Sequence, residues 1–351
     1  MTPELPDILD ARAVASTVDS IAAVQERSGA IPWFAGGQLD PWDHVEAAMA
    51  LDVGGRHARA RAAYRWLRAE QRPDGSWPAL YRNGAPAAAT AETHHAAYVA
   101  VGLWHHFLAT GDEAFLAEQW PTVRRALDFV VRHQAASGVI AWAVDPATGP
   151  AAEALLTGCA STYHGLRCAV AIAERLGRGQ PDWELAATDL ADVLRCRPDL
   201  FADKSRYSMD WYYPVLGGAV RGPLAARRLA ERWDEFVVPG FGVRCVADRP
   251  WVTGAETCEL ALALHAIGAA DAAKTCVAAM QHLRDDDGSY WTGLVFDEGV
   301  RWPVERTTWT AAAVVLAVDA IAGVHPRGAI FEAAGLVADD AAEQAQRAAS
   351  G

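Results

Sequence analysis

The chain has 351 residues, of which 52% are hydrophobic and 21% charged, so it is long and apolar enough to build a large folded core. Its 44 acidic and 31 basic residues give a formal net charge of −13 without a basic patch, which argues against a nucleic-acid partner. No uninterrupted apolar run could span a bilayer and no signal peptide is recognisable, so we expect a cytoplasmic protein.

Helices are predicted along nearly the whole chain, and they alternate strictly between two kinds. Amphipathic helices rich in arginine are predicted, in chain order, at residues 14–26, 56–70, 119–134, 183–195, 223–236 and 271–283. Helices that are apolar on most faces are predicted at residues 45–53, 94–108, 162–176, 212–220, 257–267 and 308–322. A helix that is polar on one side belongs on a surface, whereas a helix that is apolar all round belongs inside.

A recurring turn follows four of the amphipathic helices, and in it a glutamine is followed by a glycine and then by a tryptophan. The four copies run from Gln25 to Trp33, from Gln71 to Trp77, from Gln134 to Trp142 and from Gln281 to Trp291. A recurrence at this spacing indicates that one supersecondary unit is used repeatedly.

The alternation predicts an all-α fold, an (α/α)6 toroid in which six inner helices are wrapped by six outer ones. A single helix pair could not bury its apolar face, whereas pairs that stack on one another can. We expect the first outer helix to close the ring against the last inner helix. Residues 237–246 and 289–296 are predicted as hairpins on the rim. Residues 1–351 are expected to form one domain, with a core of about residues 12–325 and a C-terminal tail at residues 326–351.

Carboxylates stand at the starts of five of the six predicted inner helices. They are Asp43, Glu92, Asp210, Glu256 and Glu305. Any one of them alone is explained by capping of free N–H groups at a helix start. Because all six loops into the inner helices would meet at one mouth, the five acids together are typical of a sugar site. Two of them could supply the acid and the base that hydrolyse a glycosidic bond.

The order of the units predicts which acids face each other. Units two and five lie opposite in a six-membered ring, so Glu92 and Glu256 are the first candidate catalytic pair, and Asp43 with Asp210 is the second. Aromatic walls and polar contacts would complete the site. The predicted substrate-binding residues are Trp33, Asp40, Trp42, Trp77, His94, His164, Trp211, Tyr212, Trp251, Arg306 and Trp309.

Metal and cofactor sites are not predicted. His94, His95, His105 and His106 gather near the second inner helix, but no matching pattern of ligand spacing stands beside them. The acidic run at residues 285–288 follows an outer helix, which favours a solvated turn. The six cysteines form no CxxC pair and are expected to be reduced thiols.

The helix alternation and the segment from Gln71 to Trp77 resemble two related groups of toroids. The first is the six-hairpin glycosidase group, including the glucoamylase-like enzymes of family 15, whose sugar-pocket segment is similar to residues 37–51. This resemblance covers roughly residues 12–325, and residues 101–129 also look like the helix-loop-helix style of that group. The resemblance implies a carbohydrate-active enzyme. The Trp-Glu acid motif of family 15 is not found, so its acid and base cannot be carried over residue by residue.

The second group is that of the terpenoid cyclases and protein prenyltransferases, whose QW repeat is similar to Gln71 through Trp77. The chain departs from both. The cyclases' DxDD proton donor is absent, and Glu256-Thr257-Cys258 matches the prenyltransferase zinc motif only faintly, because Glu replaces Asp.

The sequence therefore predicts a glycoside hydrolase that acts on a small glucoside or oligosaccharide by carboxylic acid and base catalysis. Two alternatives stay open. An isoprenoid enzyme could use the aromatic mouth to stabilise a carbocation, and a non-catalytic toroid could bind a sugar or a protein. The expected partner is a small molecule, and the sequence leaves the oligomeric state open.

Overall fold

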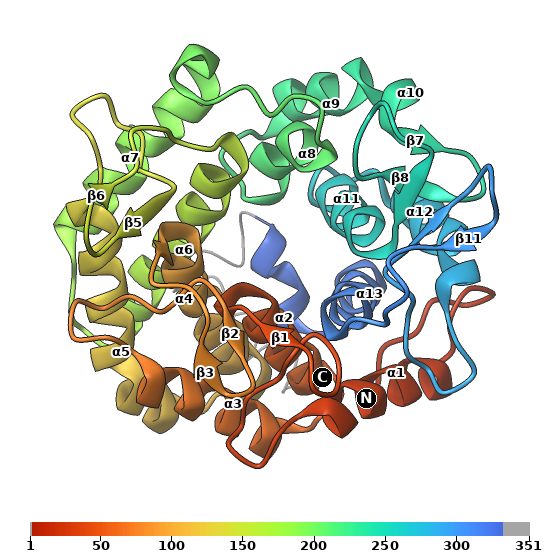
Figure 1. The fold of residues 1–351 in the computed structure, drawn as a ribbon, viewed down its shortest axis with the longest axis horizontal. Coiled ribbons are helices and arrows are strands. Elements are labelled where there is room, and N and C mark those ends of the chain that lie inside the picture. The colour runs from red at the N-terminus through yellow and green to blue at the C-terminus, as the bar shows by residue number, and fades with distance from the viewer. Residues whose placement is uncertain (1, 333–351) are drawn as a thin grey trace.

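A ring of helices surrounds a central axis in the computed structural model, which describes residues 2–332 (Figure 1). The inner helices are α2 (Pro41–Val53), α4 (Thr93–Thr110), α6 (Leu156–Arg175), α8 (Ser208–Leu216), α11 (Gly254–Ala266) and α13 (Thr308–Ala322). The outer helices are α1 (Ala11–Val24), α3 (His57–Glu70), α5 (Glu113–Arg132), α7 (Pro181–Cys196), α9 (Gly222–Glu231) and α12 (Ala270–Ala279). Each inner helix contacts the next, and α13 contacts α2, so the ring closes.

The burial of the two kinds of helix confirms the predicted (α/α)6 toroid. Every residue of α2 except Trp42 is buried, whereas α1 buries only one face. The first outer helix packs against α13, as the sequence predicts. Several boundaries differ: the third outer and third inner helices each begin six residues earlier than predicted, and the fourth inner helix ends at Leu216 rather than at residue 220. Two glycines follow Leu216, and Gly218 has a φ of +88°, which a right-handed helix does not allow.

Three of the recurring turns join one outer helix to the next. Gln71 Nε2 donates to the carbonyl of Gly75 at 3.0 Å and to that of Thr122 in α5 at 3.0 Å. Gly75 has a φ of +99°, and a Cβ there would lie 2.0 Å from the Arg125 carbonyl oxygen. The turns after Gln25 and Gln134 repeat the two glutamine bonds. The repeated glutamine therefore links neighbouring outer helices through its hydrogen bonds.

Three small antiparallel sheets lie on one rim of the ring. The first contains β1 (Gln38–Leu39), β2 (Tyr81–Arg82) and β3 (Ala85–Pro86), and the second contains β4 (Ala91–Glu92), β5 (Ala143–Asp145) and β6 (Gly149–Pro150). The third has the order β11 (Val300–Arg301), β10 (Gly293–Val295), β9 (Trp251–Thr253), β8 (Gly242–Arg244) and β7 (Val237–Val238). The predicted rim hairpins fall within this third sheet. Since β4 and β9 lead directly into α4 and α11, this rim holds the starts of inner helices.

The opposite end of the ring is covered by the 3-10 helix η3 (Pro326–Phe331), which contacts α4, α11 and α13 and lies near the centre of Figure 1. Arg327 of η3 donates to both carboxylate oxygens of Asp319 in α13, at 2.9 and 2.8 Å. The predicted tail is therefore partly a structural element, and its residues 333–351 lie outside the described part of the chain. In residues 2–332, no helix has the length and apolarity that crossing a membrane requires.

Candidate active site

The centre of the ring collects acidic side chains from the first two turns of the inner helices. Asp43 and Glu46 lie three residues apart on α2, and Glu256 and Glu259 have the same spacing on α11. Residues three apart share one face of a helix, so each helix turns two acids in the same direction. We call the six acids gathered here the central carboxyls. They are Asp40, Asp43, Glu46, Glu92, Glu256 and Glu259.

Glu46 and Glu259 form the deeper part of the site. Tyr98 Oη donates to Glu46 Oε1 at 2.8 Å, Tyr213 Oη donates to Glu259 Oε1 at 3.1 Å, and Tyr212 Oη donates to Glu259 Oε2. Burial raises the pKa of Glu46 to about 7. Burial, with the added charge of Glu46, also raises the pKa of Glu259 well above its ordinary value. The two groups are therefore held by tyrosines in surroundings that favour protonation.

Asp40 and Asp43 lie at the start of α2. Asp40 caps the helix, accepting the N–H groups of Trp42 at 3.0 Å and Asp43 at 2.9 Å, and it accepts the Trp33 indole N–H at 2.7 Å. Burial and the nearby charges of Asp40 and Glu46 raise the pKa of Asp43 well above its ordinary value. These surroundings therefore favour the protonated form of Asp43.

Glu92 meets two histidines at the start of α4. Its Oε2 lies 3.4 Å from His94 Nε2 and 3.7 Å from His95 Nε2, and His95 Nε2 lies 4.0 Å from Asp40 Oδ1. Burial raises the pKa of Glu92 to about 7. Burial also lowers the pKa of His95 to about 3 and that of His94 well below its ordinary value, so both imidazole rings are neutral at physiological pH. The three ligand atoms lie within 4.8 Å of one another, so these residues could hold a metal ion.

Glu256 is 4% exposed, on the opposite side of the ring from α4. Its Oε2 has no hydrogen-bond partner among the described residues. Burial raises the pKa of Tyr212 and of the Cys245 thiol, and the neighbouring Glu256 carboxyl adds to both shifts. Glu256 therefore lies on the α8 side of α11. A buried acceptor without a partner is costly to leave unsatisfied, so this oxygen is available to a ligand or a water molecule.

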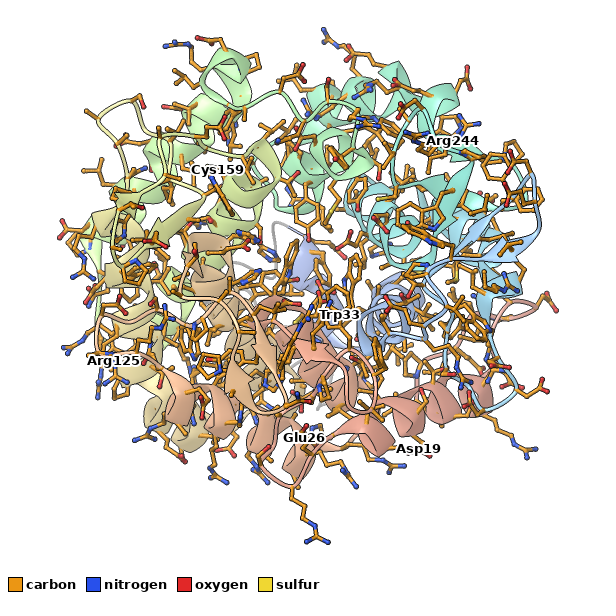
Figure 2. The ribbon with its side chains drawn as sticks, in the orientation of Figure 1. Asp19, Glu26, Trp33, Arg125, Cys159 and Arg244 are labelled. Atoms are coloured by element: carbon orange, nitrogen blue, oxygen red, sulfur yellow. The ribbon has the colours of Figure 1, made fainter. Side chains whose placement is uncertain are left out.

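Tryptophans line the central site. Trp42 makes edge contacts with His94, Tyr98 and Tyr213, at centroid distances of 5.2, 5.4 and 5.6 Å. Burial raises the pKa of Glu46, and the nearby indoles of Trp42 and Trp309 offset part of that rise, although neither ring nitrogen completes a hydrogen bond to a described residue. Figure 2 shows Trp33 beside the ring axis, whereas Arg125 and Arg244 lie on the periphery.

Several predicted site residues lie elsewhere. The Trp77 indole N–H donates to the Leu67 carbonyl and the Trp211 indole N–H to the Arg228 carbonyl, each at 2.8 Å, so both rings belong to the wall of the ring. Trp251 donates to the Trp302 carbonyl on the rim sheet. Trp77 belongs to a turn, Trp211 to the inner helix α8 and Trp251 to a strand, and packing accounts for all three.

Asp210 and His164 also differ from the expectation. Asp210 Oδ1 accepts the Thr157 hydroxyl at 2.6 Å and the Thr157 N–H at 3.3 Å, so it caps the neighbouring helix α6. His164 Nε2 lies 3.0 Å from the Ile330 carbonyl oxygen of η3, at the covered end of the ring. Asp210 therefore has no place opposite Asp43 in a catalytic pair.

Glu305 and Arg306 lie outside the central site as well. They line a separate cavity beside α1, where Arg306 Nη1 bonds to Asp285 Oδ2 at 2.7 Å and to Asp287 Oδ2 at 3.1 Å. The acidic run at residues 285–288 is therefore a turn bridged by an arginine. The first carboxylates of five helices do not all converge, because the loop before α13 turns away from the axis.

Residues of the second helical turn were missed by the sequence analysis. They are Glu46, Tyr98, Tyr213 and Glu259. The signal that could have found the two glutamates is their isolation in otherwise apolar helices, each one turn after an acid already singled out. No Lys or Arg stands among the groups that most strongly shift the pKa values of Asp43, Glu46, Glu92 and Glu259. The site is thus acidic without a counterion from the described residues.

Comparison with known proteins gives one close match in sequence. The chain is 56% identical over 329 residues to an MMP endo-(1,4)-3-O-methyl-alpha-D-mannosidase of Mycolicibacterium hassiacum, and the match covers 94% of this chain and 91% of that enzyme. No protein-family model matches the chain.

Solved structures resemble this fold at low sequence identity. A glycosidase in complex with glucose has a TM-score of 0.71 at 15% identity, covering 89% of this chain and 96% of its own. A D-mannose isomerase has a TM-score of 0.66 at 12% identity, with 90% and 99% covered. A rhamnosidase from Klebsiella oxytoca with rhamnose bound has a TM-score of 0.62 at 14% identity, with 90% and 64% covered. At these identities the likeness concerns the fold.

Proposed function

Because this chain belongs to the family of the MMP endo-(1,4)-3-O-methyl-alpha-D-mannosidase and is a glycoside hydrolase, we propose that it cleaves internal α-(1,4) linkages between 3-O-methylmannose units. The observation that carries this proposal is the 56% identity, which extends over 94% of the chain and therefore includes every element of the central site. The acidic, tryptophan-lined centre of the ring supports it, since hydrolysis of a glycosidic bond needs two carboxyl groups.

The general acid in this proposal is Asp43. An acid must carry a proton at the working pH, and burial together with the charge of Asp40 raises the pKa of Asp43 well above its ordinary value. The three N–H groups that donate to Asp40 hold that carboxylate in place, so its charge keeps acting on Asp43. Asp43 would donate its proton to the leaving glycosidic oxygen.

The general base in this proposal is Glu256. Its unpartnered Oε2 is free to accept a hydrogen bond from a water molecule, and removal of that proton would let the water oxygen attack the anomeric carbon. Glu256 belongs to both the sequence-based pair and this one. Glu92 changes role, because its contacts with His94 and His95 suit it to hold substrate hydroxyls.

Membership of a wider group of glycosidases is also proposed. We place the chain with the six-hairpin, family 15-like glycosidases, which the six pairs of inner and outer helices support. We also propose one domain for residues 1–351 and a cytoplasmic location, which the six free thiols support.

Product analysis tests the proposed substrate. The purified enzyme is incubated with a 3-O-methylated α-(1,4)-mannan, and with unmethylated α-(1,4)-linked glucan as a matched polymer. We expect medium-length oligosaccharides from the methylated mannan at early times, because an endo enzyme cuts inside the chain. Release of single sugars only would contradict internal cleavage. Equal hydrolysis of the glucan would contradict the proposed substrate.

A further inference from the structure

A cavity beside the central site is not used by the proposed chemistry. It has a volume of about 780 Å³ and lies between α1 and the loops before and after β10 and β11. We call it the side groove. Its lining includes Ser16, Phe34, Asp287, Trp291, Glu305 and Arg306.

The side groove and the central site share one wall. This wall is the loop at residues 32–35, which is tied to the start of α13 by two bonds from Thr308, its N–H to the Trp33 carbonyl at 2.7 Å and its hydroxyl to the Pro32 carbonyl at 2.9 Å. Trp33 bonds to Asp40 on the central side, and the next residue, Phe34, lines the groove. Consecutive Cα atoms are about 3.8 Å apart, so a chain leaving the centre would cross a wall only a few residues thick.

The lining of the groove is ordered before any ligand arrives. The Phe34 ring lies so close to Gly37 that a Cβ at Gly37 would be 2.8 Å from it. The Arg306 guanidinium lies over the Trp291 ring, 5.3 Å from its centroid, while its bonds to Asp285 and Asp287 fix its position. An ordered surface loses little entropy when a ligand binds.

The chemistry of the lining suits a neutral, partly methylated sugar. The negative charges of Asp19 and Asp287 are paired, with Arg56 at 2.6 Å and with Arg306 at 3.1 Å. The Glu305 carboxyl has no side-chain partner among the described residues, so it is free to accept hydroxyl donors. Phe34 and the neighbouring small apolar side chains offer contact for O-methyl groups. A charged polymer would find no unpaired cation here.

We propose that the side groove is a second binding site for the 3-O-methylmannose chain, and that it holds sugar units beyond those at the central carboxyls. This inference rests on the proposed function. The occupant is the same substrate molecule, because only the loop at residues 32–35 separates the groove from the central site. Substrate length should therefore change affinity through residues that never contact the reacting bond.

Kinetics with substrates of two lengths test the groove. The variants Phe34→Ala and Glu305→Gln are compared with Phe241→Ala and Glu184→Gln, which alter an aromatic ring and an acid outside both sites. For long 3-O-methylmannose oligosaccharides, we expect kcat/KM of each groove variant to fall about tenfold, mainly through KM, because every tenfold change corresponds to a modest loss of binding energy. For the shortest cleavable oligosaccharide, we expect no change.

Two outcomes would overturn the groove: equal losses on short and long substrates, or no loss on either. If the unaltered enzyme cleaves neither substrate, the proposed function fails, and a binding titration with the same oligosaccharides then tests the groove. Tighter binding of the long oligosaccharide that disappears in Phe34→Ala supports the groove. Length-independent affinity overturns it.

Discussion

The two ends of the ring surround buried carboxyl groups with different partners. At the covered end, Asp52 accepts from His106 Nδ1 at 2.8 Å and meets His57 Nδ1 at 2.9 Å, and these contacts lower its pKa in spite of burial. Asp319 at that end is bonded twice by Arg327, which offsets part of the rise that burial causes in the pKa of Asp319. At the open end, Asp43, Glu46 and Glu259 lie among acids, tyrosines and indoles, and burial raises the pKa of each.

This difference separates structure from function in one molecule. Paired carboxylates at the covered end hold helices and η3 together, and the cationic or imidazole partner of each offsets part of the cost of burying it. Asp43, Glu46 and Glu259 at the open end have no cationic or imidazole group among the main influences on their pKa values, so their burial is a cost to the fold. Groups that remain in such surroundings are candidates for chemistry. The comparison predicts that variants at the two ends fail in different assays.

The largest expected effect is on turnover at the open end. We expect Asp43→Asn and Glu256→Gln each to reduce kcat by about 10²–10⁴-fold, because each removes one proton-transfer group. Their melting temperatures should stay close to that of the unaltered enzyme, since neither group has a cationic partner to lose. Steady-state kinetics and thermal unfolding measure the two quantities. Asp210→Asn is the matched control, and full activity in Asp43→Asn would end the assignment.

The covered end should respond in stability instead. Arg327→Met leaves the Asp319 carboxylate buried without its partner, and we expect a loss of roughly 3–5 kcal/mol in the free energy of unfolding. The double variant Arg327→Met with Asp319→Leu should recover part of that loss. Urea unfolding measures both. A kcat that falls in folded Arg327→Met as far as in Asp43→Asn would erase the distinction between the two ends.

The raised pKa of Glu46 at the open end should also make the stability of the protein depend on pH. Burial raises the pKa of Glu46 from 4.5 to about 7, so the folded state binds this proton more tightly than the unfolded state does. The resulting stability is complete below about pH 4.5 and is lost as the pH rises towards 7, by up to about 3 kcal/mol. Glu46→Gln should flatten that slope. An unchanged slope in this variant would contradict the raised pKa.

The smallest expected effect concerns a tryptophan of a recurring turn. Trp77→Phe removes the hydrogen bond to the Leu67 carbonyl, so we expect a loss of about 1 kcal/mol in stability. Its kcat/KM should equal that of the unaltered enzyme, since Trp77 lies in the wall of the ring. Trp42→Phe is the comparison, because Trp42 contacts His94 and Tyr98 in the central site. Equal losses of activity in both would contradict this division.

The fold could be predicted from the sequence because its helix types and turns repeat along the chain. Apolar and amphipathic helices alternate, and Gln71 with Gly75 repeats a bond pattern that each unit needs. The site could be predicted only in part. Asp43, Glu92 and Glu256 stand at helix starts, where an acid can be recognised from the sequence. Glu46 and Glu259 lie one helical turn further along, inside apolar stretches. Asp210 misled the pairing, because the direction in which a side chain leaves a helix start depends on packing that chain order does not encode.

Hydrolysis of 3-O-methyl-α-mannosyl fluoride by the two central variants is the most direct test of the account. Fluoride leaves without a general acid, whereas the attack of water still needs a base. We therefore predict that Asp43→Asn cleaves this fluoride at close to the rate of the unaltered enzyme while failing on oligosaccharides, and that Glu256→Gln fails on both. Loss of fluoride hydrolysis in Asp43→Asn, or its survival in Glu256→Gln, would contradict the roles assigned to the central carboxyls.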